Sequence, residues 1–319
     1  MICNFCYRAC DIKEGGEGYC HVRKVHDNHL YSSGYGYLDA LDIDPVEKKP
    51  LYHFLPGTKT LSVVEAGCNY HCDFCQNWQL SQSEKSSNST FVTPEKLVEL
   101  ALQFKVPSIS FTYSEPIVWQ DYVINTSILA KKEGLKTIMV TNGSFSKESL
   151  KVLYPLIDAF NIDLKGDAAY YKRVCNGDIE PVLNGIEYMV EKGCHVEVTT
   201  LLIENIHTET IIKNLGKALK QRGVNVWHLT RFFPSYKMKD RAETSEKFLA
   251  NMINIASASG IPYIYGGNTS SVYSTFCSNC KRELILRDRI DYSVRKESLR
   301  NLENGYCIYC NNPIYGVFD

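Results

Sequence analysis

The chain has 319 residues, and its 35 basic and 36 acidic side chains give a formal net charge of −1. With 44% hydrophobic and 22% charged residues, the composition is that of an ordinary globular protein and excludes disordered, collagen-like and coiled-coil chains. The balanced charge makes nucleic acid an unlikely partner, and no segment has the ~18 consecutive apolar residues of a membrane span.

The N-terminal segment is rich in cysteine. It lacks the basic and apolar regions of a secretory signal, so we expect a cytoplasmic protein, in which clustered cysteines bind metals more often than they form disulfides. The first cluster, with the spacing C-x2-C-x3-C-x9-C, consists of Cys3, Cys6, Cys10 and Cys20. This spacing does not distinguish a zinc ion from an auxiliary iron–sulfur (4Fe-4S) cluster. We therefore expect residues 1–58 to form a small metal-binding segment.

A second cysteine cluster follows the first predicted strand of the main domain. Cys68, Cys72 and Cys75 have the spacing C-x3-C-x2-C. Three thiolates can bind three irons of a 4Fe-4S cluster and leave the fourth iron free for an exogenous ligand. A structural zinc site is the alternative, but it needs a fourth ligand, and His71 between the cysteines has no usual zinc spacing. The motif therefore favours an open iron–sulfur site.

The middle of the chain repeats a unit of helix and strand. The helical patterns end at glycines that suit a left-handed C-terminal cap: Gly134, Gly193, Gly223 and Gly260. Other helices begin at capping residues, namely Thr93, Thr208 and either Thr244 or Ser245. The six predicted strands cover residues 61–66, 108–112, 137–140, 159–163, 196–202 and 224–229. This alternation predicts an α/β fold, a partial (β/α)6 barrel over residues 59–270, with a doubly wound open sheet as the alternative.

Polar side chains recur where these strands end. They are Glu115 after the second strand, Thr141 and Asn142 after the third, Asp163 and Lys165 after the fourth, and His228 at the sixth. On the fifth strand, Thr199 and Leu201 share one face because side chains alternate. Since active sites of barrels lie at the carboxyl ends of the strands, we expect these residues around one pocket.

The C-terminal segment, residues 271–319, contains a third cluster made of two C-x2-C pairs. Its members are Cys277, Cys280, Cys307 and Cys310. Two such pairs are typical of a zinc ribbon, in which tetrahedral zinc is closed on all sides. An auxiliary iron–sulfur cluster is the alternative. We expect a zinc-ribbon-like structural segment.

The C-x3-C-x2-C motif, with Phe74 before its last cysteine, resembles the signature of radical S-adenosylmethionine (SAM) enzymes. The resemblance implies that SAM binds the open iron through its amino and carboxylate groups. One-electron cleavage of SAM then gives methionine and a 5′-deoxyadenosyl radical, which takes a hydrogen atom from a substrate. A reductant such as flavodoxin or ferredoxin supplies the electron.

Two further segments narrow this resemblance. Residues 44–57 and Cys75-Gln76-Asn77-Trp78, together with the flanking cysteines, resemble the radical SAM component of the AmmeMemoRadiSam system. The barrel itself is similar to pyruvate formate-lyase-activating enzyme and other activators of glycyl radical enzymes. Those activators usually have no four-cysteine sets at both ends, and residues 44–57 could equally be a linker packed under the barrel.

The resemblance also implies roles for the strand-end residues. Glu115 would meet the SAM ammonium, Thr141 and Asn142 the ribose or carboxylate, Lys165 the carboxylate, Asp163 a monovalent cation and His228 the ribose. The fifth-strand pair, Thr199 and Leu201, would line the same pocket. The family usually has Gly-Gly-Glu-Pro where this chain has Tyr113-Ser114-Glu115-Pro116. The backbone geometry at Tyr113 is therefore an open question.

These observations predict a radical SAM oxidoreductase whose substrate, by resemblance, is a glycine in a glycyl radical enzyme. Modification of another protein, an RNA or a small molecule is the alternative within this class. A zinc or iron–sulfur electron-transfer module without radical chemistry is the alternative from another class. The three-thiolate site distinguishes them, because a closed carrier cluster normally has four protein ligands.

Overall fold

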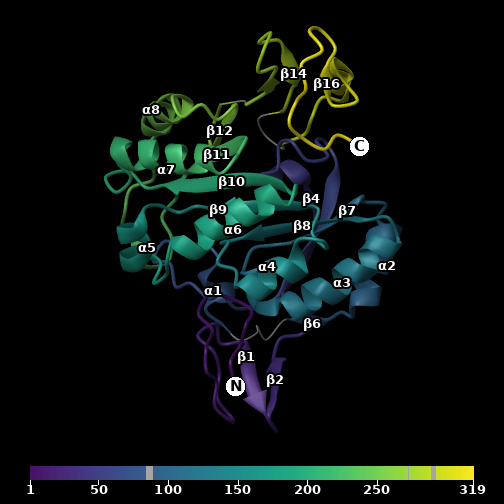
Figure 1. The fold of residues 1–319 in the computed structure, drawn as a ribbon, viewed down its shortest axis with the longest axis vertical. Helices are drawn as coiled ribbons and strands as arrows, with labels where there is room; N and C mark the ends of the chain where they lie inside the picture. The colour runs from purple at the N-terminus through teal and green to yellow at the C-terminus, as the bar shows by residue number, and fades with distance from the viewer. Residues whose placement is uncertain (84–88, 272, 289–291) are drawn as a thin grey trace.

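The computed structural model describes residues 1–83, 89–271, 273–288 and 292–319 (Figure 1). Its central strands, in chain order, are β4 (Ala40–Pro45), β5 (Lys59–Val64), β7 (Ser108–Phe111), β8 (Lys136–Thr141), β9 (Ala159–Asp163), β10 (His195–Leu202), β11 (Val226–Arg231) and β12 (Tyr263–Gly267). They form one eight-stranded sheet in the order β12-β11-β10-β9-β8-β7-β5-β4. Neighbouring strands are parallel apart from β4 and β5, which are antiparallel. In the described chain, β4 and β12 pair on one side only, so the barrel stays open.

This sheet confirms the predicted α/β partial barrel and adds a strand at each edge. The six predicted strands are the six central ones, from β5 to β11. β12 continues the parallel order next to β11, while β4 pairs with β5 from within residues 1–58. The α/β repeat therefore extends one strand further than predicted, and the main sheet begins at residue 40.

Helices cover the outside of the curved sheet (Figure 1). They are α1 (Trp78–Ser81), α2 (Pro94–Gln103), α3 (Gln120–Lys132), α4 (Lys147–Leu153), α5 (Ala168–Val174), α6 (Glu180–Glu191), α7 (Glu209–Gln221) and α8 (Glu246–Ser257), with 3-10 turns η1 (Val46–Lys48), η2 (Pro116–Trp119), η3 (Tyr236–Met238) and η4 (Lys296–Asn301). The predicted caps are confirmed, since Thr93, Thr208 and Ser245 each accept a hydrogen bond from the backbone N–H three residues on. The four predicted helix-ending glycines all have φ between +74° and +79°.

The inside of the barrel is filled by the segment that follows β4. Its apolar side chains Val46, Leu51, Phe54 and Leu55 pack on Ile138 and Ala159 of the sheet. The fully buried carboxylate of Glu197 accepts hydrogen bonds from the backbone N–H groups of Tyr52 (2.9 Å) and His53 (2.7 Å). Buried backbone groups need such partners, so this segment is a fixed part of the core.

Small two-stranded sheets form the two ends of the chain. The N-terminal ones are β1 (Arg23–His26) with β2 (His29–Ser32) and β3 (Tyr37–Leu38) with β6 (Thr90–Phe91); the C-terminal ones are β13 (Thr275–Phe276) with β14 (Glu283–Ile285) and β15 (Leu302–Glu303) with β16 (Tyr306–Cys307). The N-terminal β1–β2 pair and the C-terminal segment lie at opposite ends of the molecule (Figure 1). No helix in the described ranges is both long and apolar enough to cross a lipid bilayer.

These two ends contact opposite faces of the barrel. Cys6 bridges to Phe145, just past the carboxyl end of β8, and the Tyr7 N–H donates to the Ser144 carbonyl at 3.1 Å. The C-terminal segment packs instead on Val226 and Tyr263, where β11 and β12 begin. The N-terminal segment therefore adjoins the carboxyl ends of the strands, and the C-terminal segment closes the other end.

Candidate functional site

One pocket at the carboxyl ends of the strands brings together every predicted residue of the barrel site apart from His228. Its predicted members are Cys68, Cys72, Phe74, Cys75, Glu115, Thr141, Asn142, Asp163, Lys165, Thr199 and Leu201. The pocket has a cavity volume of about 330 Å³ and opens to solvent. Ligand pockets usually measure about 300–1,000 Å³, so this one is large enough for a small-molecule cofactor.

The cysteine loop begins at a glycine that no other residue can replace without strain. Gly67 has φ +100°, and a Cβ atom there would lie 2.7 Å from Val22 and 3.1 Å from the Cys20 carbonyl oxygen. The chain can therefore turn sharply after β5 only because this position has no side chain. The same close approach holds the N-terminal segment against the loop.

Hydrogen-bond donors surround the thiols of the loop. The Tyr70 N–H lies 3.4 Å from the Cys68 sulfur, and the Asn142 side-chain amide lies 3.8 Å from it. The Ser81 hydroxyl lies 3.3 Å from the Cys75 sulfur. Burial raises the pKa of the Cys68 thiol well above its usual value, so this group is neutral unless a metal makes it a thiolate.

Sulfur spacing indicates what each cysteine set can bind. In the C-terminal set, the sulfurs of Cys277 and Cys310 are 3.6 Å apart, and those of Cys280 and Cys307 are 3.7 Å apart. A tetrahedral zinc site with Zn–S bonds of ~2.3 Å has sulfurs about 3.8 Å apart, which matches this set. Among the described residues, neither the loop set nor the N-terminal set contains three sulfurs within 4.8 Å of one another. The loop therefore fits a group larger than one zinc ion.

A fourth thiol contacts this loop from outside the pocket. Cys175 is fully buried, its carbonyl accepts from the His71 N–H at 3.1 Å, and its thiol is the first cause of the raised pKa of Cys72. Cys175 does not line the pocket, and no histidine does so in the described part of the chain. Three thiols therefore face the pocket, which leaves one corner of a cubane cluster open.

Glu115 sits at the start of η2 with both carboxylate oxygens occupied. One oxygen accepts from the Thr141 hydroxyl (2.6 Å) and the Ile117 N–H (3.0 Å), and the other accepts from the Asn142 N–H (2.7 Å). Burial raises the pKa of Glu115 to about 7 despite these bonds. Glu115, Thr141 and Asn142 thus form one hydrogen-bonded unit. Because the pKa of Glu115 is about 7, a cation bound beside it would favour the ionised carboxylate.

Asp163 and Lys165 form an ion pair at the end of β9. The Lys165 ammonium lies 2.7 Å from Asp163 Oδ2 and 5.8 Å from the centre of the Phe74 ring. Burial lowers the pKa of Lys165, but Asp163 together with Cys72, Tyr171 and Cys175 outweighs it, so that pKa lies well above its usual value. Lys165 therefore keeps a fixed positive charge inside the pocket.

On β10 and β11, the structure separates residues that the sequence analysis expected around one pocket. Thr199 and Leu201 line the pocket as expected, and the buried Thr199 hydroxyl has no hydrogen-bond partner there. His228 does not reach the pocket. It lies in the middle of β11, and its Nε2 atom lies 2.6 Å from Glu197 Oε2 in the core. Thr230, two residues on and on the same face of β11, lines the pocket instead.

The sequence analysis did not predict one hydrogen-bonded group in the pocket wall, which consists of Tyr113, Asp44 and Lys49. Tyr113 has φ +69°, the left-handed conformation that favours glycine, which explains why the family pattern has glycine there. Its hydroxyl donates to Asp44 at 2.7 Å, and the Lys49 ammonium lies 2.9 Å from that hydroxyl and 2.7 Å from Asp44. The side chain thus compensates for the strained backbone. Asp44 and Lys49 both lie in the segment 44–57 that the sequence analysis singled out, but no sequence pattern connected them to Tyr113.

Other residues lining the pocket were also missed. They are Lys48, Lys49, Pro50, Tyr70, Gln76, Asn77, Ser81, Thr112, Tyr113, Ser114, Val140, Thr230 and Asn268. The Asn77 amide donates to the Tyr113 carbonyl at 2.7 Å, which joins the cysteine loop to the η2 turn.

The comparisons with known proteins agree with this geometry. A model of the radical SAM superfamily matches residues 63–215, from the first barrel strand into α7. This chain belongs to the radical SAM superfamily. An uncharacterized protein of Methanocaldococcus jannaschii is 38% identical to it over 320 residues, which cover 98% of this chain and 94% of the relative.

More distant radical SAM relatives and structures are also similar to this chain. A GTP 3′,8-cyclase of Staphylococcus haemolyticus is 22% identical over 250 residues, covering 69% of this chain and 73% of the cyclase. Streptococcus suis SuiB bound to S-adenosylmethionine superposes with a TM-score of 0.53 at 14% identity. That match covers 70% of this chain and about half, 53%, of SuiB, and it shows a common fold.

Proposed function

We propose that this protein cleaves SAM reductively at a 4Fe-4S cluster bound by Cys68, Cys72 and Cys75. When bound, the cluster and SAM supply a one-electron cleavage of the sulfonium that yields methionine and a 5′-deoxyadenosyl radical. One observation carries the proposal: three thiols, spaced too widely for a single zinc ion, share one pocket with charged and polar groups suited to SAM. A module that only carried electrons would need a fourth ligand.

The residues of the pocket divide the recognition of SAM between them. We assign Glu115 to the ammonium and Lys165 to the carboxylate, because each has the complementary charge. Thr141 and Asn142 hold Glu115 in place, and Asp163 orients Lys165. Asp163 is also the proposed ligand of a monovalent cation.

The opposite wall suits the nucleoside. Thr199, whose buried hydroxyl lacks a partner, offers a hydrogen bond to it, and Leu201 offers an apolar surface. His228 is too deep for direct contact, so we assign it to holding β10 and β11 together through Glu197.

For the substrate, our first candidate is a glycine of a glycyl radical enzyme. It rests on the similarity of the barrel to activators of glycyl radical enzymes, and the pocket is open to solvent on one side. The AmmeMemoRadiSam subtype is our narrower family proposal.

A small anionic molecule is the second candidate, favoured by one specific observation. Lys48 and Lys49 line the pocket and place two ammonium groups beside the single carboxylate of Asp44. Relatives named GTP 3′,8-cyclase point to the same class of substrate.

The remaining proposals concern the surroundings of the site. We propose a structural zinc ion at the C-terminal four-cysteine set, on the sulfur distances above, and a division into residues 1–39, 40–270 and 271–319, because β4 joins the main sheet and the segment after it fills the barrel. Flavodoxin or ferredoxin is the proposed reductant. The free cysteines, none of which forms a disulfide in the described chain, favour the cytoplasm.

The proposed activity is tested by anaerobic reconstitution with iron and sulfide, addition of dithionite and SAM, and measurement of 5′-deoxyadenosine. We expect the product from the native protein and none from Cys68→Ala. Cys194→Ala is the matched control, because Cys194 lies outside the pocket and contacts the Tyr154 carbonyl. A bound cluster with no product, or equal product from Cys68→Ala, would contradict the proposal.

The two substrate classes are separated by deuterium transfer. Proteins of the source cells, labelled with α-deuterated glycine, are tested against a uniformly deuterated small-molecule fraction. Deuterium in 5′-deoxyadenosine from the protein fraction supports the glycyl candidate. Deuterium only from the small-molecule fraction supports the second candidate.

A further inference from the structure

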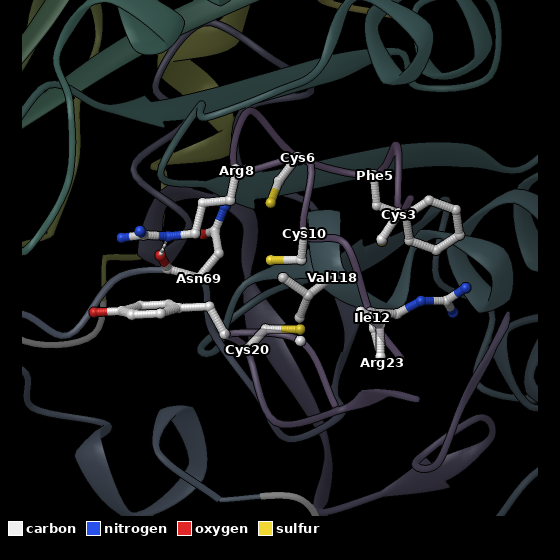
Figure 2. Close-up of a pocket in the computed structure, with 12 residues that line it drawn as sticks. Cys3, Phe5, Cys6, Arg8, Cys10, Ile12, Cys20, Arg23, Asn69 and Val118 are labelled. Carbon is white, nitrogen blue, oxygen red and sulfur yellow. Dashed lines mark hydrogen bonds between the residues drawn. The ribbon is translucent and has the colours of Figure 1, made fainter. Parts of the chain in front are cut away.

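The N-terminal four-cysteine set surrounds a second cavity, next to the SAM pocket. Cys3, Cys6, Cys10 and Cys20 all line it. Figure 2 shows Cys6, Cys10 and Cys20 around this cavity, with Arg8 and Asn69 beside them. We propose that this set binds a second 4Fe-4S cluster, which passes single electrons to the cluster at Cys68; the electron path rests on the function proposed above.

The N-terminal sulfurs are spaced for a group larger than one zinc ion. The C-terminal set shows what a zinc site looks like in this chain, with four sulfurs within 4.8 Å of one another. In the described chain, no three N-terminal sulfurs are that close, although all four line one cavity. A cubane places four irons between its cysteines, so its ligands lie farther apart than those of one tetrahedral ion.

The sulfurs lie largely out of contact with water. Cys3, Cys6 and Cys20 are buried and Cys10 is half-buried, so a cluster bound to them would be largely shielded from solvent. Solvent exposure is one of the factors that set the potential of a cluster.

The cavity walls beside the sulfurs are mainly apolar, with Phe5, Ile12 and Val118. The two arginines that line the cavity are bound elsewhere, since Arg23 pairs with Asp121 at 2.7 Å and Arg8 donates to the Asn69 carbonyl at 2.7 Å. A cluster held by the four thiolates would therefore be shielded from water by apolar side chains.

The N-terminal cavity adjoins the SAM pocket. Asn69 follows Cys68 in the chain and lines the cavity together with Cys6. The Asn142 amide donates to Asn69 Oδ1 at 2.8 Å and lies 3.8 Å from the Cys68 sulfur. Asn69 and Asn142 thus lie between the N-terminal cavity and a ligand of the loop set.

The ligand count decides the role of the second cluster. Four thiolates leave no iron open, so the cluster has no position for a substrate and is limited to electron transfer. A reduced flavin or iron–sulfur protein gives one electron to the N-terminal cluster. That cluster passes the electron to the cluster at Cys68 and returns to its oxidised state, with no bond or proton changed. The sulfonium of SAM is the final acceptor.

The cluster itself is tested without the SAM site. The triple variant Cys68→Ala, Cys72→Ala, Cys75→Ala is reconstituted anaerobically, and its iron, sulfide and zinc are measured. We expect about four iron and four sulfide per chain, with a reduced electron paramagnetic resonance (EPR) signal that SAM leaves unchanged. A protein without iron, with zinc in both terminal sets, would overturn the proposal. This outcome is independent of whether the native protein cleaves SAM.

The electron path is tested by the reductant dependence. Cys10→Ala should halve the iron of the native protein and lower 5′-deoxyadenosine formation with reduced flavodoxin at least tenfold. Formation with dithionite, a small reductant that reaches the pocket directly, should stay within about twofold. Equal loss with both reductants, or no loss with either, would overturn the relay.

A second measurement uses the native protein, in case Cys10→Ala does not fold. When both clusters are reduced, their spins should interact, so the EPR spectrum should differ from the sum of the spectra of the two single-cluster variants. A simple sum would overturn the short connection through Asn69 and Asn142.

Discussion

At the scale of single residues, the pocket depends on buried charges held by few partners. Glu115 is the clearest case, because its carboxylate is buried against Thr141 and Asn142 with no cation bonded to it. Burial raises its pKa to about 7, so the group is neutral below pH 7 in the folded protein and ionised above it. The ammonium of SAM can pair only with the ionised form.

We therefore predict that SAM affinity decreases about tenfold from pH 8 to pH 6, since one proton must leave Glu115. Glu115→Gln should bind SAM more weakly, with little dependence on pH over the same range. Equilibrium dialysis of the reconstituted protein measures both. A native affinity that is constant with pH would remove Glu115 from SAM binding.

Asp44 and Lys49 form a buried pair with a different consequence. Lys49 is 1% exposed, and Asp44 is the carboxylate bonded to its ammonium. We predict that Asp44→Asn lowers the free energy of unfolding by about 3–5 kcal/mol, because a buried ammonium loses its counter-charge. Asp42→Asn, on the same strand but exposed, is the control and should stay within about 0.5 kcal/mol. Anaerobic denaturant unfolding measures both, and equal effects would contradict the role of the pair.

At the scale of elements, the cysteine loop and the N-terminal segment are joined through Gly67. Its φ of +100° and its short approach to Val22 and the Cys20 carbonyl leave no space for a side chain. The loop can therefore adopt its course only while the N-terminal segment is packed on it.

We predict that Gly67→Ala destabilises the protein by more than the ~1 kcal/mol of an ordinary glycine with positive φ, and lowers iron binding. Gly134→Ala is the matched control, since Gly134 has φ +74° but no atom within 4 Å of its would-be Cβ. Denaturant unfolding and iron content of both variants provide the test. Equal losses would show that packing on the N-terminal segment does not matter.

At the scale of the whole molecule, the two cysteine-rich ends have different tasks because they contact opposite faces of the barrel. The C-terminal segment packs on the end of the barrel where β11 and β12 begin. Tyr315 donates to the Val196 carbonyl at 3.1 Å, and the Arg287 guanidinium lies 4.2 Å from the centre of the Tyr52 ring. These contacts support the segment inside the barrel at residues that do not line the SAM pocket.

We predict that Cys280→Ala removes one zinc per chain and lowers thermal stability, while SAM cleavage at 25 °C with dithionite keeps at least half of its rate. Metal analysis, thermal unfolding and the 5′-deoxyadenosine assay measure the three effects. A complete loss of cleavage in a folded variant would show that the C-terminal set takes part in the reaction.

Much of the molecule could be predicted from local sequence. Caps such as Thr93, glycines such as Gly134, and the alternation of strands and helices depend on neighbouring residues, so they predicted the α/β barrel. The C-x3-C-x2-C loop and most strand-end side chains were predicted for the same reason. β4 was missed because it pairs antiparallel with β5 and no α-helix separates the two strands, so the alternation of helix and strand gave no sign of it.

What the sequence determined by itself is therefore the set of candidate ligands and the order of the elements, since both follow from spacing along the chain. The tertiary structure alone decided that Thr230 rather than His228 reaches the pocket, because strand register sets the depth of a side chain. It also decided that Asp44, Lys49 and Tyr113 meet, and that the N-terminal cysteines lie beside the loop. Those contacts join residues far apart in the chain, and only packing brings them together.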